Sequence, residues 1–81
     1  MTTSSAVLEA GLARAHWHAV DLWRATLAVG GDFSRQDVES FLDGTRSATG
    51  AEHDILASTL NDHFVEHDAN HPISYWRDLD H

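Results

Sequence analysis

Apolar side chains recur every three or four positions along most of the chain, a spacing typical of amphipathic helices. From about residue 5 to residue 29 this pattern predicts one long helix, which Ser4 or Ser5 would cap and Gly30-Gly31 would end. Such a helix would be roughly 37 Å long. Its apolar face consists of Leu8, Leu12, Ala15, Ala19, Leu22, Trp23, Thr26 and Leu27. Its polar side carries Arg14, Trp17, Asp21 and Arg24.

Capping signals predict two further helices. Ser34, with Asp37 three residues later, predicts the start of a short helix over about residues 35–43. The run Thr49-Gly50-Ala51-Glu52 is a T-x-x-E capping box, which predicts a second long helix over about residues 50–68. The apolar positions that should face the core are Val38, Phe41 and Leu42 in the first helix and Leu56, Leu60 and Phe64 in the second.

Two features lie outside these core stripes. Ile55 and Val65 fall on the far side of the helix over residues 50–68, which indicates a helix that is contacted on two sides. After Pro72, residues 75–79 predict a short helical turn in which Tyr75, Trp76 and Leu79 pack down together. We expect this tail to dock on the helices or on a partner.

The predicted fold is therefore an all-α bundle in a single domain that spans residues 1–81. A chain of 81 residues has room for one modest core. Because the chain contains no cysteine, disulfides and thiolate zinc sites are excluded. Its stability must then come from helix packing or from further surface buried in an oligomer or a complex.

The charge balance narrows the choice of partners. Thirteen acidic residues against five arginines give a net charge of −8. This field repels phosphates and argues against general nucleic-acid binding, whereas it suits a basic protein partner or mimicry of a polyanion. The sequence shows no secretory signal and no run long enough to cross a bilayer, so we expect a cytoplasmic protein without membrane contact.

Histidines provide the main candidate for metal chemistry. In the run His63-Phe-Val-Glu-His67 two imidazoles lie four residues apart, and one helix face could present both to a metal. Candidates for a third ligand are His71, Asp68, His53, or His16 and His18. The same helical spacing places His53 and His67 close to the centre of the core-facing stripe and His63 at its edge, where an imidazole ordinarily serves packing and hydrogen bonding. We therefore expect no cofactor and treat a divalent metal at His63, His67 and His71 as the alternative.

Enzymatic signatures are not visible in the sequence. It has no thiol nucleophile, no lysine for a Schiff base, no glycine-rich phosphate loop and no G-x-S-x-G motif. A chain of this length also has little material for a pocket that excludes water. We expect a non-catalytic protein, or a small subunit of a larger enzyme.

Part of the chain resembles a phage-repressor-type helix-turn-helix domain. The resemblance covers residues 27–64: Gly31, Phe33 and Ser34 match the turn, residues 35–42 the reading helix, and Leu56-Ala57 with Leu60 the helix that follows. It implies a transcriptional regulator that contacts DNA. The family carries a pair of short helices before the turn, where this sequence predicts one long helix. The DNA-contacting side chains would be Arg35, Gln36, Ser40 and Arg46.

The interpretation that these patterns favour is a small acidic regulatory module that acts through protein–protein interaction, as a homodimer or with a protein partner. Aromatic side chains are common anchors in such interfaces. The predicted partner-binding residues are Trp17, Asp21, Arg24, Tyr75 and Trp76.

Overall fold

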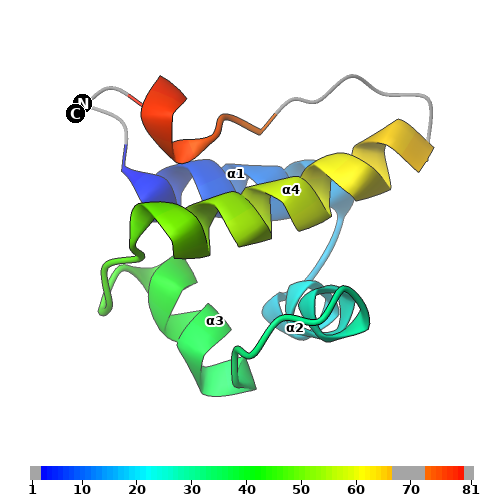
Figure 1. The fold of residues 1–81 in the computed structure, drawn as a ribbon, viewed down its shortest axis with the longest axis horizontal. Coiled ribbons are helices and arrows are strands. Elements are labelled where there is room, and N and C mark those ends of the chain that lie inside the picture. The colour runs from blue at the N-terminus through cyan, green and yellow to red at the C-terminus, as the bar shows by residue number, and fades with distance from the viewer. Residues whose placement is uncertain (1–2, 67–72, 80–81) are drawn as a thin grey trace.

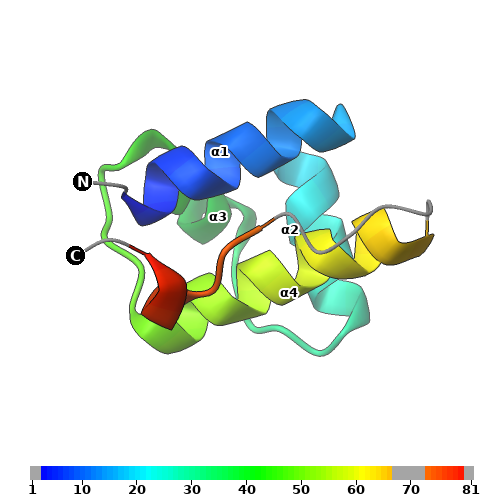
Figure 2. The same cartoon turned by 90° about the horizontal axis from the view of Figure 1, so that it is seen from above.

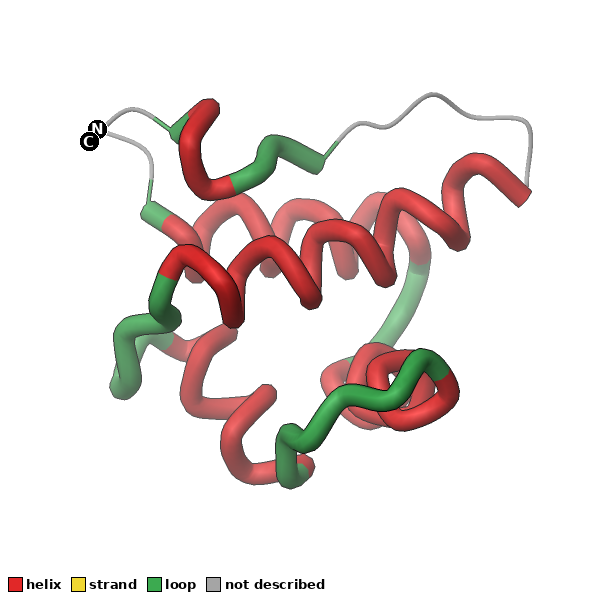
Figure 3. Tube along the Cα trace, viewed as in Figure 1, coloured by secondary structure: helices red, strands yellow, loops and turns green. Residues whose placement is uncertain are grey.

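The computed structural model describes residues 3–66 and 73–79, and this part of the chain forms an all-α bundle without strands (Figure 3). The elements are α1 (Ser4–Ala15), α2 (Ala19–Ala28), α3 (Arg35–Asp43), α4 (Gly50–Glu66) and the 3-10 turn η1 (Trp76–Asp78). Helices α1 and α4 lie side by side, with α2 and α3 on one side of them and η1 on the other (Figure 1). The predicted fold class is thereby confirmed.

The predicted long helix over residues 5–29 is wrong, because the chain breaks it into α1 and α2. His16 adopts the left-handed conformation (φ 58°, ψ 37°), and the N–H of Trp17 returns to the carbonyl of Leu12 at 2.9 Å. Histidine tolerates this conformation better than most non-glycine residues. The next helix then starts with the backbone N–H of His18 donating to the Asp21 carboxylate at 2.8 Å.

Packing explains why the break is favourable. A continuous helix of roughly 37 Å would exceed the longest dimension of the bundle, which is 30 Å. The break lets α2 turn back over α3 and α4, and it brings Trp17 from the predicted polar side onto the core. One consequence is that Leu27, which we expected in the core, is 46 % exposed.

The other helix starts follow the capping signals. In α3, the Ser34 hydroxyl accepts from the Asp37 N–H at 3.0 Å, and the Asp37 carboxylate accepts from the Ser34 N–H at 3.1 Å. Thr49 and Glu52 exchange the same pair of bonds at α4. The expected cap of α1 is shifted, because Thr3 rather than Ser4 or Ser5 accepts from the Ala6 N–H.

The core forms where the four helices meet. The predicted inward positions of α3 and α4 are buried. Ile55 and Val65, which indicated a helix contacted on two sides, are instead exposed. The end of α4 predicted at residues 67–68 lies outside the described residues. The core cluster comprises Leu8, Leu12, Leu22, Val38, Phe41, Leu42, Ala48, Leu56, Ala57, Leu60, Phe64 and Ile73.

Residues 73–79, which we call the C-terminal segment, dock on the bundle. The segment runs along α1 and α4 on the side opposite α2 and α3 (Figures 1 and 2). Ile73 and Leu79 are buried, and η1 packs on α4. This confirms the predicted helical turn. The segment was expected to dock either on the helices or on a partner, and it docks on the helices of its own chain.

Candidate protein-interaction surface

A surface pocket of about 480 Å³ lies where the C-terminal end of α2 approaches α4. Its apolar lining is contributed by Val29 after α2, Ile55 on α4 and Tyr75 in the C-terminal segment. Val29 is 61 % exposed and Ile55 is 41 % exposed. The polar lining consists of Asp54, Ser58, Thr59 and Asp62. The pocket, which we call the α2–α4 pocket, is thus lined by three apolar or aromatic side chains together with the carboxylates of Asp54 and Asp62.

Local structure explains why these apolar side chains remain uncovered. Val29 caps the end of α2, and Gly30 follows with φ 85°, so the chain turns away from α4 at this point. Leu56 and Leu60 of α4 are fully buried, whereas Ile55 lies on the exposed side of the same helix. None of the seven lining residues is basic, so the charged groups of this surface are the two carboxylates of Asp54 and Asp62.

The third wall of the pocket depends on the docking of the C-terminal segment. Side chains of α4 hold its backbone: the Asn61 carboxamide accepts from the Ile73 N–H and donates to the Ile73 carbonyl, both at 3.0 Å. The Asp54 carboxylate accepts from the Trp76 N–H at 2.7 Å. Tyr75 lies between these two anchor points and is thereby fixed against the pocket.

His53 adds a further tie to the same segment. Its ring is fully buried, with Nδ1 2.6 Å from the Ser4 hydroxyl and Nε2 2.8 Å from the Ser74 carbonyl. Since a carbonyl only accepts, Nε2 carries a proton, and Nδ1 is then free to accept from Ser4. One imidazole therefore joins the start of α1, α4 and the C-terminal segment, which is a structural role.

The predicted metal ligands are only partly within the described residues. His63 is half-buried, and its ring lies 4.5 Å from that of Trp17 and 5.5 Å from that of Phe64. Within residues 3–66 and 73–79, no group of three potential ligands comes together. His67 and His71 lie outside the described residues, so the metal site with His63 stays a prediction.

The predicted partner-binding residues are not brought together on one surface. Trp17 packs against the core, and Asp21 caps α2. Arg24 is exposed on α2. Tyr75 lines the α2–α4 pocket, whereas the Trp76 ring lies against Gly50 at the start of α4. Of the five residues, only Tyr75 belongs to the pocket.

The predicted DNA-contacting side chains lie on or beside α3. Arg35 and Gln36 are exposed and Ser40 is half-buried. Arg35 pairs with Glu39 on the same helix at 3.3 Å. The two helices α1 and α2 precede α3 in place of the predicted single long helix, and the helix-turn-helix resemblance itself stays a prediction.

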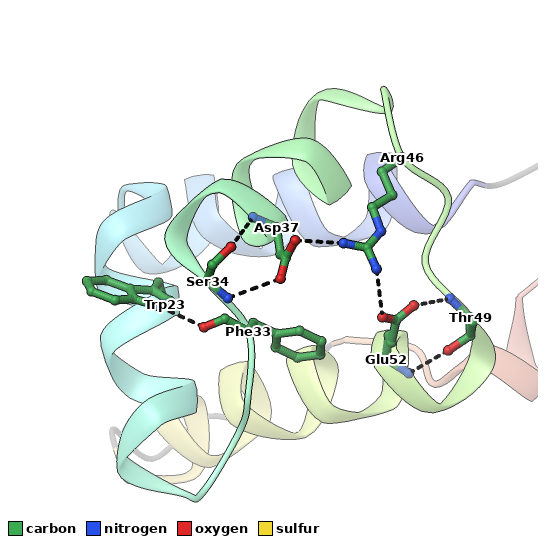
Figure 4. A network of polar contacts seen from close by, with 7 residues as sticks. All are labelled: Trp23, Phe33, Ser34, Asp37, Arg46, Thr49 and Glu52. Carbon is green, nitrogen blue, oxygen red and sulfur yellow. Dashed lines mark hydrogen bonds and ion pairs between the residues drawn. The ribbon is translucent and has the colours of Figure 1, made fainter.

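Arg46 links the starts of α3 and α4 (Figure 4). Its guanidinium lies 2.6 Å from the Asp37 carboxylate and 3.6 Å from that of Glu52, the two acids that complete the capping boxes. It also lies over the Phe41 ring, 4.9 Å from the centroid. The hydrogen bond from the Ser34 backbone N–H, aided by the Ser34 hydroxyl and by Arg46, lowers the pKa of Asp37.

Sequence reasoning did not identify most of the α2–α4 pocket. Val29, Asp54, Ser58 and Asp62 had no signal of their own. The two available signals were Tyr75, a predicted partner-binding residue, and Ile55, an apolar residue on the far side of α4. The pocket needs the turn after α2 and the docked C-terminal segment, and both are long-range features.

Within the described residues, no helix is long and apolar enough to cross a membrane. Comparison of the chain with protein-family models, with curated proteins and with solved structures found no match.

Proposed function

We propose that this chain is a non-catalytic, regulatory protein-interaction module of the cytoplasm, whose α2–α4 pocket binds a basic, amphipathic helix of a protein partner. The partner would insert an aliphatic side chain between Val29, Ile55 and Tyr75. Its arginine or lysine side chains would meet Asp54 and Asp62.

The observation that carries this proposal is the combination of apolar exposure and uniform charge in one pocket. Single exposed apolar residues are common and need no explanation. Here Val29, which follows α2, and Ile55 on α4 share a pocket with an aromatic ring and two carboxylates. Amphipathic helices are commonly bound in such grooves through apolar anchors at helical spacing. The net charge of −8 would also accelerate the approach of a basic partner.

A capture experiment with matched variants tests the proposal. The full chain, Ile55→Asp and Val65→Asp are each immobilised and exposed to a lysate of the source organism. Both variants place a carboxylate on the exposed face of α4, but only Ile55 lines the pocket. We expect one protein that the unchanged chain and Val65→Asp retain, that Ile55→Asp loses, and that salt elutes. Equal retention by all three chains would contradict the proposal.

DNA binding is the second candidate, and the observation that favours it is the pair of short helices before the turn and α3. In this case Arg35 and Gln36 would contact bases. Arg46 would have to leave Asp37 and Glu52 in order to reach a phosphate. Salt-dependent retention of the chain on random duplex DNA, lost in Arg35→Ala, would support this function. Absence of retention at low salt would exclude it.

A further inference from the structure

The C-terminal segment is held in the way that a binding site holds a short peptide. Three side chains of α4, His53, Asp54 and Asn61, form hydrogen bonds to its backbone at Ser74, Trp76 and Ile73 respectively. Bonds to backbone groups recognise an extended chain, and side-chain pockets then determine which residues fit.

Two glycines shape the places where the side chains of the segment lie. A Cβ at Gly11 of α1 would lie 2.7 Å from Ile73 Cδ1, and a Cβ at Gly50 of α4 would lie 2.8 Å from Trp76 Cδ1. Real Cβ atoms do not approach other atoms so closely. At Gly50 the rigid indole ring of Trp76 would have to move as a whole, whereas at Gly11 the flexible end of the Ile73 side chain could shift. Leu79, three residues beyond Trp76, is buried as well. The segment therefore carries apolar anchors at positions 73, 76 and 79.

The segment depends on the bundle for these contacts rather than on its own fold. Its internal backbone hydrogen bonds, from Asp78 to Tyr75 and from Leu79 to Trp76, form only the single turn η1. In the sequence, six residues, 67–72, join it to the end of α4. Every contact that holds it could thus be made equally well with α1 and α4 of another molecule.

We propose that the binding site on α1 and α4 also receives the C-terminal segment of a second copy, so that reciprocal exchange of residues 73–79 forms a homodimer. The contacts are the same in the monomer and in the exchanged dimer, so the ratio of dimer to monomer depends on the protein concentration. A short linker gives its own segment an effective concentration of about 1 mM, so exchange becomes appreciable as the protein concentration approaches this value.

Exchange would also affect the α2–α4 pocket. Tyr75 forms part of its lining, so in the dimer each pocket would be completed by the tyrosine of the other copy. This inference does not rest on the proposed partner, because the residues that hold the segment act whether or not the pocket is occupied.

Complementation between two full-length variants tests the exchange. The donor, Gly50→Ala, keeps the native segment but places a methyl group where Trp76 must lie; alanine suits the first turn of a helix, so α4 is preserved. The acceptor combines Ile73→Ala with Trp76→Ala, so its own segment has lost two anchors while its binding site is intact. Both are studied by sedimentation equilibrium at about 0.5 mM, close to the effective concentration of a short linker.

We expect each variant alone to be monomeric and the equimolar mixture to contain a species of twice the mass, with one copy of each chain by native mass spectrometry. A donor that also carries Trp76→Ala is the control and should not associate. A mixture that sediments as the sum of its two components would overturn the proposal. Circular dichroism checks that the acceptor keeps its helices; if it does not, Trp76→Ala alone replaces it.

The unchanged chain provides a second measurement that needs no acceptor. Its dimer fraction should rise at least about tenfold between roughly 10 µM and 1 mM, a range that ends at the effective concentration of a short linker. Gly50→Ala should abolish this rise, whereas Ile55→Asp, in the α2–α4 pocket, should leave it intact. A chain that stays monomeric throughout, or a dimer that Gly50→Ala leaves unchanged, would also overturn the proposal.

Discussion

The carboxamide of Asn61 pairs with the backbone of Ile73 through two hydrogen bonds, each 3.0 Å long. A neighbouring β-strand would offer the same donor and acceptor, but here a helical side chain supplies both. Asn61 is almost completely buried, so neither bond has to compete with water. This one residue therefore fixes the start of the C-terminal segment and, through it, the Tyr75 wall of the α2–α4 pocket.

Replacing Asn61 by alanine should release the segment. The change removes both bonds and leaves the buried N–H and carbonyl of Ile73 without partners, which costs about 2–3 kcal/mol of unfolding free energy. Urea denaturation followed by circular dichroism measures the loss. Asp62→Ala, at the exposed neighbouring position, should change stability by less than about 0.5 kcal/mol. Equal stability of the two variants would show that the segment is not held through Asn61.

His53 should couple the start of α1 to the rest of the bundle. In the unchanged chain, Ser4→Ala removes one hydrogen bond to the ring and should cost about 1 kcal/mol. In a chain that already carries His53→Ala, the same substitution should cost almost nothing, because the shared bond is gone. A double-mutant cycle by urea denaturation measures this difference. Additive effects of the two substitutions would mean that the contact contributes nothing.

The break between α1 and α2 can be tested by placing glycine at residue 16. Glycine there should stabilise a broken helix but destabilise a continuous one. His16 occupies the left-handed region at φ 58°, which glycine adopts without strain. We therefore expect His16→Gly to raise the unfolding free energy by about 0.5–1 kcal/mol.

The matched control for this break is Ala13→Gly, inside α1, which should lose about 1 kcal/mol because glycine is a poor helix former. Thermal denaturation of both variants compares the two effects. If the chain ran as one helix through residue 16, both substitutions would be destabilising, and the break described above would be incorrect.

Trp17 should act as a packing residue. Its ring is half-buried and lies 4.5 Å from that of His63. Truncation to alanine should lower the unfolding free energy by about 2 kcal/mol, roughly half the cost of removing a fully buried tryptophan. Arg24→Ala, at an exposed position of α2, serves as the control. A Trp17→Ala chain of unchanged stability that loses a partner would instead support the predicted role in binding.

The start of α3 should become weaker in acid. The pKa of Asp37 is lowered in the folded chain, first by the hydrogen bond from the Ser34 N–H, so folding favours the charged carboxylate. The stabilisation is therefore complete above the ordinary value of 3.8 and is lost as the pH falls through the lowered folded pKa.

Asp37→Asn isolates this effect. The melting temperature of the unchanged chain should exceed that of the variant at pH 7, and the gap should close as the pH falls below 3.8, the ordinary pKa of the carboxyl. Asp62→Asn, which alters an exposed carboxylate that caps no helix, should show no such closing gap. A gap for Asp37→Asn that widens in acid would contradict the assigned cause.

How far the sequence predicts the structure differs between local and long-range features. The capping boxes at Ser34 and Thr49 act within four residues, and both helix starts were predicted correctly. The break at His16 was missed because the apolar spacing continues through it. In addition, the N-cap residue of α2 is His18 rather than a serine or threonine, so the start of α2 lacked the usual sequence signal.

The α2–α4 pocket was out of reach for a different reason. It joins residues as distant as Val29 and Tyr75, which the turn after α2 and the hydrogen bonds of α4 bring together. Trp17 was assigned to the polar side because one helix was predicted over residues 5–29, and that helix is broken into α1 and α2. Periodicity assigns a residue to a face correctly only while the helix that carries it is continuous.

The central claim is that the α2–α4 pocket binds a basic amphipathic helix, and an amide chemical-shift titration tests it most directly. The full-length, ¹⁵N-labelled chain is titrated with a synthetic helical peptide that carries leucine on one face and arginine on the opposite face. The predicted result is a saturable set of shifts centred on Val29, Ile55, Ser58 and Asp62, weakened by salt and lost in Ile55→Asp. Shifts centred on α3, or no saturable shifts at low salt, would contradict the claim.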